Sequence, residues 1–285
     1  MKTNDTDFLD SAKLNTRTYQ YYYERILSIG MNCFKWKNLP DTVDERFLMY
    51  NLFIDGKMVF FHDKVLGYLC LRGSVGAGFD VYNNPLTRHA YAVNGYFKDL
   101  GINDSVIIWS NYLRKPEILW VELFARRLAE IERTVDTNIK AQKTPVLILS
   151  DERQRMTLKN LYMKYDGNYP FIFGDKNLSS VMQTMKAINT QAPFVADKLQ
   201  AIKSQIWSEV LTWLGVSNLN LSKKERLVSD EVSSNMGAIE IEQNVRLNSL
   251  KQYCKEINKM FGLNVDVEFF SEPLIEIERE INQNE

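Results

Sequence analysis

Residues 193–216 read PFVADKLQAIKSQIWSEVLTWLGV, and this stretch decides the fold. Its apolar side chains recur at steps of four, three, four, four and three residues, which is the spacing of one helix face. The residues of this face are Val195, Leu199, Ile202, Ile206, Val210 and Trp213. Pro193 suits the start of a helix, and Gly215 suits the left-handed turn that ends one. The stretch therefore predicts an amphipathic helix over about 193–214.

The next segment, KKERLVSDEVSSN (223–235), is short, charged and rich in serine, and it contains neither glycine nor proline. It has no apolar face to bury, so we interpret it as an exposed loop. The residues alone leave three roles open: a linker between domains, an active-site lid, or a loop that acts on something outside the protein.

Two further helices are predicted from the same period, over about 16–37 and 116–142. The region 57–112 has a different pattern, in which the β-rich runs KMVFFH, VLGYLCL and SVIIWS alternate with Gly, Asn, Asp and Pro. Shorter elements follow: a strand at PVLIL, a helix, turn and strand in 157–173, a charged helix at 245–261, and a strand at NVDVEFF. The chain thus predicts long helices from distant parts of the sequence that bracket smaller modules.

Composition places few limits on function. The chain has 285 residues, 35 basic and 36 acidic side chains, and a net charge of −1, so it has no overall attraction to nucleic acid. The three cysteines, Cys33, Cys70 and Cys254, are far apart and are expected to be buried free thiols. No apolar run approaches the ~18 residues of a membrane span, so no membrane partner is expected.

The residues also offer little for catalysis. His62 and His89 belong to no metal-binding or catalytic motif, so we expect no metal, no cofactor and no enzyme. The turn GSVGAGFD resembles a phosphate-binding loop, but the spacing of Gly73, Gly76 and Gly78 differs from that motif and no amphipathic helix follows. A nucleotide-dependent enzyme that uses this turn is kept as an alternative.

Several longer stretches are similar to one family. They are AQKTPVLI (141–148), 192–235, FKWKNLPDTV (34–43), DVYN (80–83) and GLNVDVEF (262–269). On these residues the chain resembles the head–tail connector, or portal (upper collar), proteins of small podophages that prime DNA synthesis with a protein. The resemblance is collinear from about residue 20 to 282.

The resemblance implies an α+β, mainly α, portal fold that assembles as a ring of twelve copies at one capsid vertex. It implies these parts: a flexible arm (1–14), stem helices (15–39, 116–143 and 192–215), a wing (40–115 and 245–270), a clip (144–191), a channel loop (216–244) and an acidic crown segment (271–285).

It also implies site residues. Lys198, Lys203, Lys223, Lys224 and Arg226 are expected to face DNA in the channel. The expected channel loop contains Ser229, Asp230, Glu231, Ser233, Ser234 and Asn235. The clip is expected to dock the packaging motor and later the tail through Tyr162, Lys164, Tyr165, Asp166 and Asn168.

The implied partners are further copies of the chain, double-stranded DNA, major capsid and scaffolding proteins, the packaging ATPase and a tail or lower collar protein. The implied location is the virion, after assembly in the host cytoplasm. The chain departs from the family pattern at Asn189, where a second lysine ring is expected, and at its arm. The arm contains one lysine and three aspartates in MKTNDTDFLDS, so contact with a packaging RNA is not carried over. Another virion ring, such as a lower collar or adaptor, is a third interpretation.

Overall fold

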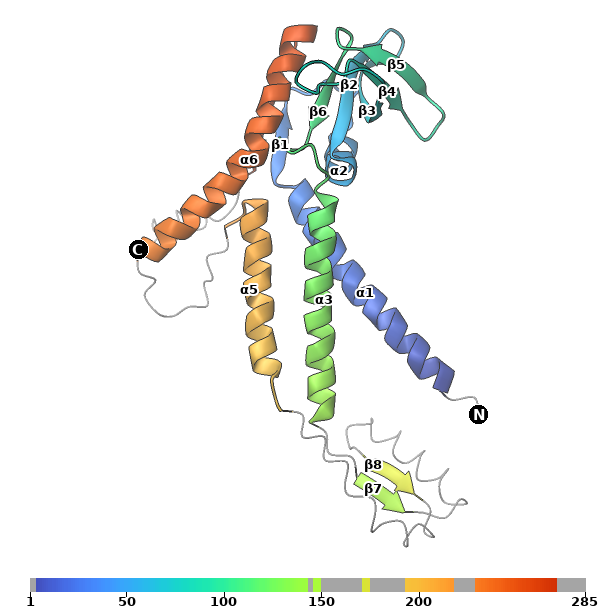
Figure 1. Cartoon of the computed structure of the whole chain (residues 1–285), viewed down its shortest axis with the longest axis vertical. Coiled ribbons are helices and arrows are strands. Elements are labelled where there is room, and N and C mark those ends of the chain that lie inside the picture. The colour runs from blue at the N-terminus through green and yellow to red at the C-terminus, as the bar shows by residue number, and fades with distance from the viewer. Residues whose placement is uncertain (1–3, 143–145, 150–170, 175–192, 218–228, 271–285) are drawn as a thin grey trace. The chain divides into compact units, whose positions relative to one another are not determined.

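The computed structural model describes residues 4–142, 146–149, 171–174, 193–217 and 229–270 (Figure 1). The chain divides into two compact units. The first combines Met1–Arg127 with Ile206–Glu285, and the second is Leu128–Gln205. Both boundaries fall inside long helices, so each unit is described by itself.

The first unit contains a five-stranded antiparallel sheet in the order β5-β4-β3-β2-β6. Its strands are β2 (Lys57–Asp63), β3 (Gly67–Val75), β4 (Thr87–Tyr91), β5 (Phe97–Gly101) and β6 (Ser105–Trp109). Helix α2 (Glu45–Asp55) precedes the sheet, and the side chain of Asp44 caps its first turn by accepting from the backbone of Phe47. The β-rich module predicted over 57–112 is present.

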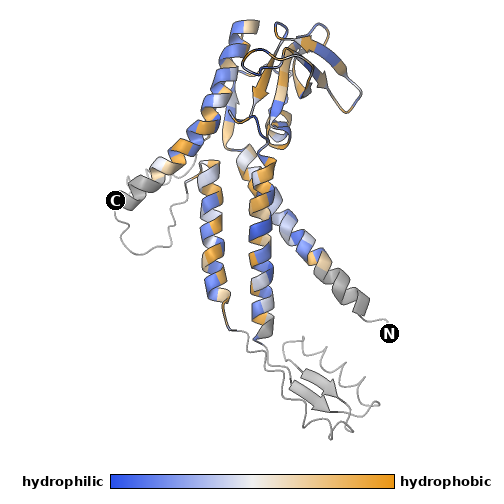
Figure 2. Cartoon of the chain, in the orientation of Figure 1, coloured by the Kyte–Doolittle hydropathy of each residue, from blue (hydrophilic) through white to orange (hydrophobic). Residues whose placement is uncertain are grey.

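Strand β2 is the centre of the core, because its residues are buried on both faces of the sheet. On one face, Val59 and Phe61 pack in a cluster with residues of β4, β5 and β6. On the other face, the ring of Phe60 lies 5.5 Å from that of Phe261, at the end of helix α6 (Ser229–Phe261). Figure 2 shows hydrophobic residues along β2 and β6, and a mixture of both colours on the other strands of the sheet. A strand buried on both sides reads as a continuous apolar run, as KMVFFH does.

A second, two-stranded sheet joins distant parts of the chain. Strand β1 (Phe34–Lys37) pairs antiparallel with β9 (Asp266–Phe269), and the rings of Phe34 and Phe269 meet edge to face. The predicted stem helix over 15–39 therefore ends earlier, at Met31. In the sequence, apolar side chains at helical spacing continue to Cys33, which extended the predicted helix. The tertiary pairing with β9 overrides local propensity in the residues that follow.

Helix α1 (Asn4–Met31) also begins earlier than predicted. The sequence suggested a flexible arm over 1–14, whereas the backbone is helical from Asn4. This segment contains no glycine or proline, and once a helix is nucleated each added residue gains one hydrogen bond. The helix therefore extends beyond its apolar stripe.

Helices α3 (Ile118–Ala141) and α5 (Ala196–Leu214) correspond to the two other predicted long helices. In the first unit, the rings of Phe124 and Trp213 lie 5.7 Å apart, and Arg127 pairs with Glu209 at 3.3 Å. Val121, Ala125, Val210 and Leu214 are buried. The apolar stripes that predicted these helices thus face the protein core at these positions.

The second unit contains the remaining parts of α3 and α5. The side-chain amide of Asn138 donates to the carbonyl of Pro193 and accepts from the backbone of Val195, so it fixes the entry into α5. Strands β7 (Val146–Leu149) and β8 (Phe171–Gly174) pair in parallel. Both strands were predicted, and the helix and turn expected between them lie outside the described residues.

Helix α6 requires a correction to the predicted channel loop over 216–244. The backbone is helical from Ser229, so Ser229–Asn235 lie in a helix and not in a loop. In the sequence, the acidic residues Asp230 and Glu231 follow Ser229 directly, a pattern that favours a helix start. The segment was predicted as a loop because its sequence is polar and shows no apolar helix face.

Candidate functional site

Two of the predicted channel residues lie on helix α5, in the second unit. Lys198 is exposed to solvent. Lys203 is half-buried, and its ammonium group lies 2.7 Å from the carboxylate of Glu132 on α3. Since Glu132 balances the charge of Lys203, Lys198 is the more accessible of the two cations.

Most other predicted site residues lie outside the described residues. These are Lys223, Lys224 and Arg226 of the channel, and Tyr162, Lys164, Tyr165, Asp166 and Asn168 of the clip. Asn189 and the acidic segment 271–285 lie outside them as well. The roles assigned to these residues therefore stay predictions.

The end of α5 is fixed against α6, on either side of the predicted channel loop. Gly215 takes φ +76° and ends the helix, as predicted, and the amide of Val216 donates to the carbonyl of Leu211 in a Schellman-type cap. Two side chains of α6 complete this cap: Gln243 donates to the carbonyl of Gly215, and Arg246 donates to that of Trp213. The buried guanidinium of Arg246 thus lies at the negative end of the α5 dipole.

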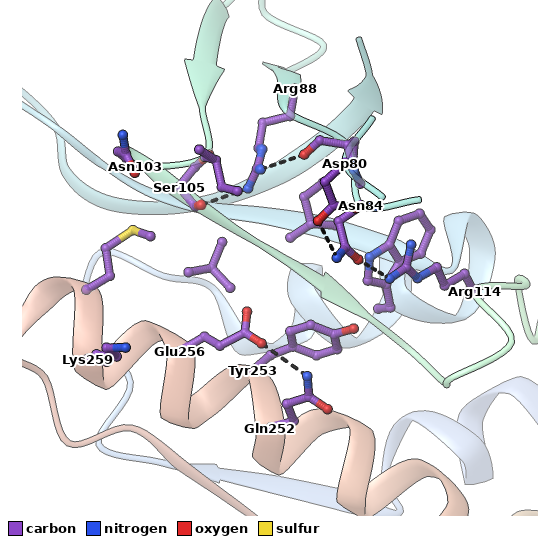
Figure 3. A pocket seen from close by; sticks show the side chains of 16 residues that line it. Asp80, Asn84, Arg88, Asn103, Ser105, Arg114, Gln252, Tyr253, Glu256 and Lys259 are labelled. Atoms are coloured by element: carbon purple, nitrogen blue, oxygen red, sulfur yellow. Dashed lines mark hydrogen bonds between the residues drawn. The ribbon is translucent and has the colours of Figure 1, made fainter. Parts of the chain in front are cut away.

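The first unit also contains a pocket of about 520 Å³ between the sheet and α6 (Figure 3). Its polar lining comes from the 80–88 segment, from residues 103 and 105, from Arg114 and from one face of α6. Residues with polar or charged side chains in this lining are Asp80, Asn84, Arg88, Asn103, Ser105, Arg114, Gln252, Tyr253, Glu256 and Lys259. Sequence reasoning did not find this pocket.

Arg88 is the unusual residue of this pocket, because it is a charged side chain only 5% exposed. Its guanidinium donates to the backbone carbonyls of Ser105 and Pro85, as Figure 3 shows. Among the residues that the structure describes, its Nε atom has no hydrogen-bond partner. Burial lowers the pKa of the Arg88 guanidinium, and the charge of nearby Glu256 partly opposes this shift. Burial also raises the pKa of Tyr253 to about 12.

A rigid turn borders the pocket. The Asp80 carboxylate accepts hydrogen bonds from the backbone of Tyr82 and from both the backbone and side chain of Asn84, and these bonds lower its pKa. Arg114 donates to Asn84 from the other side (Figure 3). The turn holds Val81 and Tyr82 almost fully exposed. These contacts explain the motif DVYN as a structural turn.

Comparison with known protein families identifies the family of this chain. The sequence model described as Phage Connector (GP10) matches residues 7–274. The chain belongs to the phage connector family. This match spans both units and includes nearly every element described above.

The fold of this connector is similar to that of a solved phage portal. The chain in the structure described as "Portal and tail of native bacteriophage P68" aligns with a TM-score of 0.51 and 16% sequence identity. The alignment covers 99% of this chain and 95% of that chain. At 16% identity, the structural alignment supports a common fold, and the family match supports the function. The protein is a head–tail connector, a structural component of a bacteriophage virion.

The glycine turn of the connector lacks the surroundings of a nucleotide site in the residues that the structure describes. Gly73 lies inside β3, where a side-chain carbon would meet Val59 at 2.2 Å, and Gly76 packs against Thr87. After the turn, Phe79 and Pro85 pair in an isolated β-bridge, and residues 79–85 form no helix. The strand–turn–helix context of phosphate loops is thus missing from this segment. Close packing explains two of the glycines, and the nucleotide-dependent alternative is not supported.

The histidines and thiols of the connector have structural environments. His62 packs against the ring of Tyr68, and His89 contacts Asp99 and stacks on Phe97. All three cysteines are buried and free. In the part of the chain that the structure describes, no cluster of three or more His, Cys, Asp or Glu side chains could hold a metal ion. A search of the same residues finds no helix suited to cross a membrane.

Proposed function

We propose that this connector assembles as a ring of twelve copies at one capsid vertex and that its channel passes double-stranded DNA during packaging and ejection. The observation that carries the proposal is the family match over residues 7–274. Long helices suit such a role, because α1, α3 and α5 have 28, 24 and 19 residues. At ~1.5 Å per residue, each extends roughly 30–40 Å, which is enough to line a channel.

The parts of the chain have separate tasks in this proposal. The helices α1, α3 and α5 form the channel wall, and the module at 40–115 together with 245–270 forms the wing. The clip at 144–191 docks the packaging ATPase first and the tail later. Capsid and scaffolding proteins are the remaining partners, and assembly takes place in the host cytoplasm.

In this proposal, the channel binds the passing DNA only weakly. DNA carries one charge per ~1.7 Å of its axis, so a strongly basic channel would hold the duplex tightly. The chain is nearly neutral overall, and Lys198 is exposed whereas Lys203 is paired with Glu132. A ring of Lys198 side chains would give the DNA a few isolated contacts and still let it slide.

Negative-stain imaging of the purified protein tests the assembly. We expect a hollow disc with twelve-fold symmetry and a stem. A uniform monomer would rule out the proposal, and a ring without a stem would favour a lower collar or adaptor instead.

The substitution Lys198→Ala tests the DNA contact. We expect rings to form normally and DNA retention in filled heads to become less sensitive to salt, because one phosphate contact per subunit is removed. Lys203→Ala should have a smaller effect, since Glu132 already balances that charge. Lys255→Ala, an exposed lysine on α6, is the matched control. Equal retention in all three variants at every salt concentration would contradict the role of Lys198.

A further inference from the structure

The first turns of helix α3 expose an apolar surface. Leu119, Trp120 and Leu123 are 54%, 48% and 46% exposed, and they lie on one side of the helix. The opposite side, with Val121, Ala125 and Leu128, is buried in the protein. We call Leu119, Trp120 and Leu123 the α3 stripe.

Helix α6 exposes a second apolar surface. Ile241 and Val245 are 66% and 45% exposed, and Ala238 precedes them by three residues on the same side. The side that faces the core carries Ile239, Arg246 and Leu250. A side chain at Gly237 would meet nothing within 4 Å, so the surface there is open to close approach. We call Ala238, Ile241 and Val245 the α6 stripe.

The two stripes belong to the first unit but lie apart on it. Figure 1 shows the N-terminal half of α6 and the start of α3 separated, with the C-terminal half of α5 between them. Neither stripe can therefore cover the other within one copy. Two different surfaces that are to meet between identical copies form a heterologous interface, which closes into a ring when the rotation between copies permits.

We propose that the α3 stripe of one copy packs against the α6 stripe of the next copy. Each stripe has the width of a helix–helix contact, with apolar residues at steps of three and four. Exposed charges flank both stripes: Glu122 and Arg126 lie beside Leu123 on α3, and Glu240 adjoins Ile241 on α6. The favoured register therefore places Arg126, and not Glu122, opposite Glu240. A second copy of the chain is the expected partner, because every copy carries one α3 stripe and one α6 stripe. The inference rests on the proposed ring and identifies the surfaces that build it.

A pair of cysteines tests this contact in the full chain. In the double variant Leu123→Cys with Ile241→Cys, oxidation should link each copy to the next and give a ladder of covalent multimers. Each single variant should remain monomeric on a denaturing gel. The native thiols of Cys33, Cys70 and Cys254 are buried, so they should not contribute. The control pair is Val93→Cys with Ile241→Cys, since Val93 is 98% exposed on the sheet hairpin.

The possible outcomes separate this inference from the proposed function. A ladder from the double variant alone supports the contact. Rings in the microscope without a ladder overturn the contact and leave the ring intact, whereas absence of rings from the unmodified chain overturns both. Covalent dimers from either single variant indicate a symmetric contact and overturn the heterologous one.

A charged substitution gives an independent measurement. Leu123→Glu buries an unpaired carboxylate in the proposed interface, so we expect the fraction of protein in rings to fall by about tenfold or more. Val93→Glu should leave that fraction unchanged. A Leu123→Glu protein that forms rings as well as the unmodified chain would overturn the contact.

Discussion

Replacing Gly215 by alanine should weaken the connection between α5 and α6 more than an ordinary helix cap would predict. Gly215 has φ +76°, and alanine in this left-handed conformation costs about 1–2 kcal/mol. Its new side-chain carbon would also lie 2.6 Å from Cγ of Gln243 and 3.2 Å from the backbone of that residue. Contacts this short require the Gln243 side chain to move and the end of α5 to shift away from the middle of α6.

Such a movement would break the hydrogen bond from Gln243 to the Gly215 carbonyl, which contributes about 0.5–1.5 kcal/mol. We therefore expect Gly215→Ala to lower the free energy of unfolding by roughly 1.5–3.5 kcal/mol. Gly262→Ala is the matched control. Gly262 also ends a helix with positive φ, at +68°, but its new side chain would meet nothing within 4 Å. This control should lose only about 1–2 kcal/mol.

The measurement is urea denaturation followed by circular dichroism, with all variants at one protein concentration because assembly stabilises the folded chain. The double variant Gly215→Ala with Gln243→Ala removes the closest clash, so its loss should be smaller than the sum of the two single losses. If Gly215→Ala and Gly262→Ala differ by less than about 0.5 kcal/mol, the contact with α6 contributes nothing and the reasoning fails.

Three further predictions concern other parts of the first unit. Asn111→Ala should lower the free energy of unfolding by about 1–3 kcal/mol, because buried Glu117 loses the hydrogen bond that the Asn111 amide donates. A urea midpoint equal to that of Asn103→Ala would contradict this. Asp63 accepts from Lys98 and from nearby backbone amides, which holds the pKa of its carboxyl well below the usual range. The stabilisation by ionised Asp63 is therefore present above the unfolded pKa of about 4 and is lost on acidification. The melting temperature should fall more steeply below pH 5 in the unmodified protein than in Asp63→Asn. Parallel profiles of melting temperature against pH would refute this prediction. Burial raises the pKa of the Cys70 thiol, so iodoacetamide should label it only after unfolding, and labelling of the native chain would disprove that.

Elements with a strong local pattern could be predicted from the sequence. The helix stripe over 193–214 and the glycine that ends it are properties of neighbouring residues, and the structure confirms both. The β-rich runs of 57–112 are similarly local. By contrast, β1 forms because it pairs with β9, more than two hundred residues later, and no local period reveals such a partner.

The candidate sites show the same division. Lys198 was predicted through a resemblance and lies exposed on its helix, whereas the balance of Lys203 by Glu132 depends on a contact between two helices. Arg88 stands in the polar run TRHAY, which suggests a surface position. It is buried because β4 lies inside the sheet and α6 covers its neighbourhood. Alternation with buried Ala90, two residues later, was the available signal.

The pairing of β1 with β9 has a consequence for synthesis of the chain on the ribosome. Lys37 and Asp266 are register partners, and the 228 residues between them take roughly 10–50 s to translate at ~5–20 residues per second. Throughout that interval, β1 has no partner strand from its own chain. A prematurely terminated product that lacks 266–269 would therefore leave this sheet unfinished. In the proposed ring, such fragments would compete poorly with complete chains, so the late strand would favour complete chains during assembly.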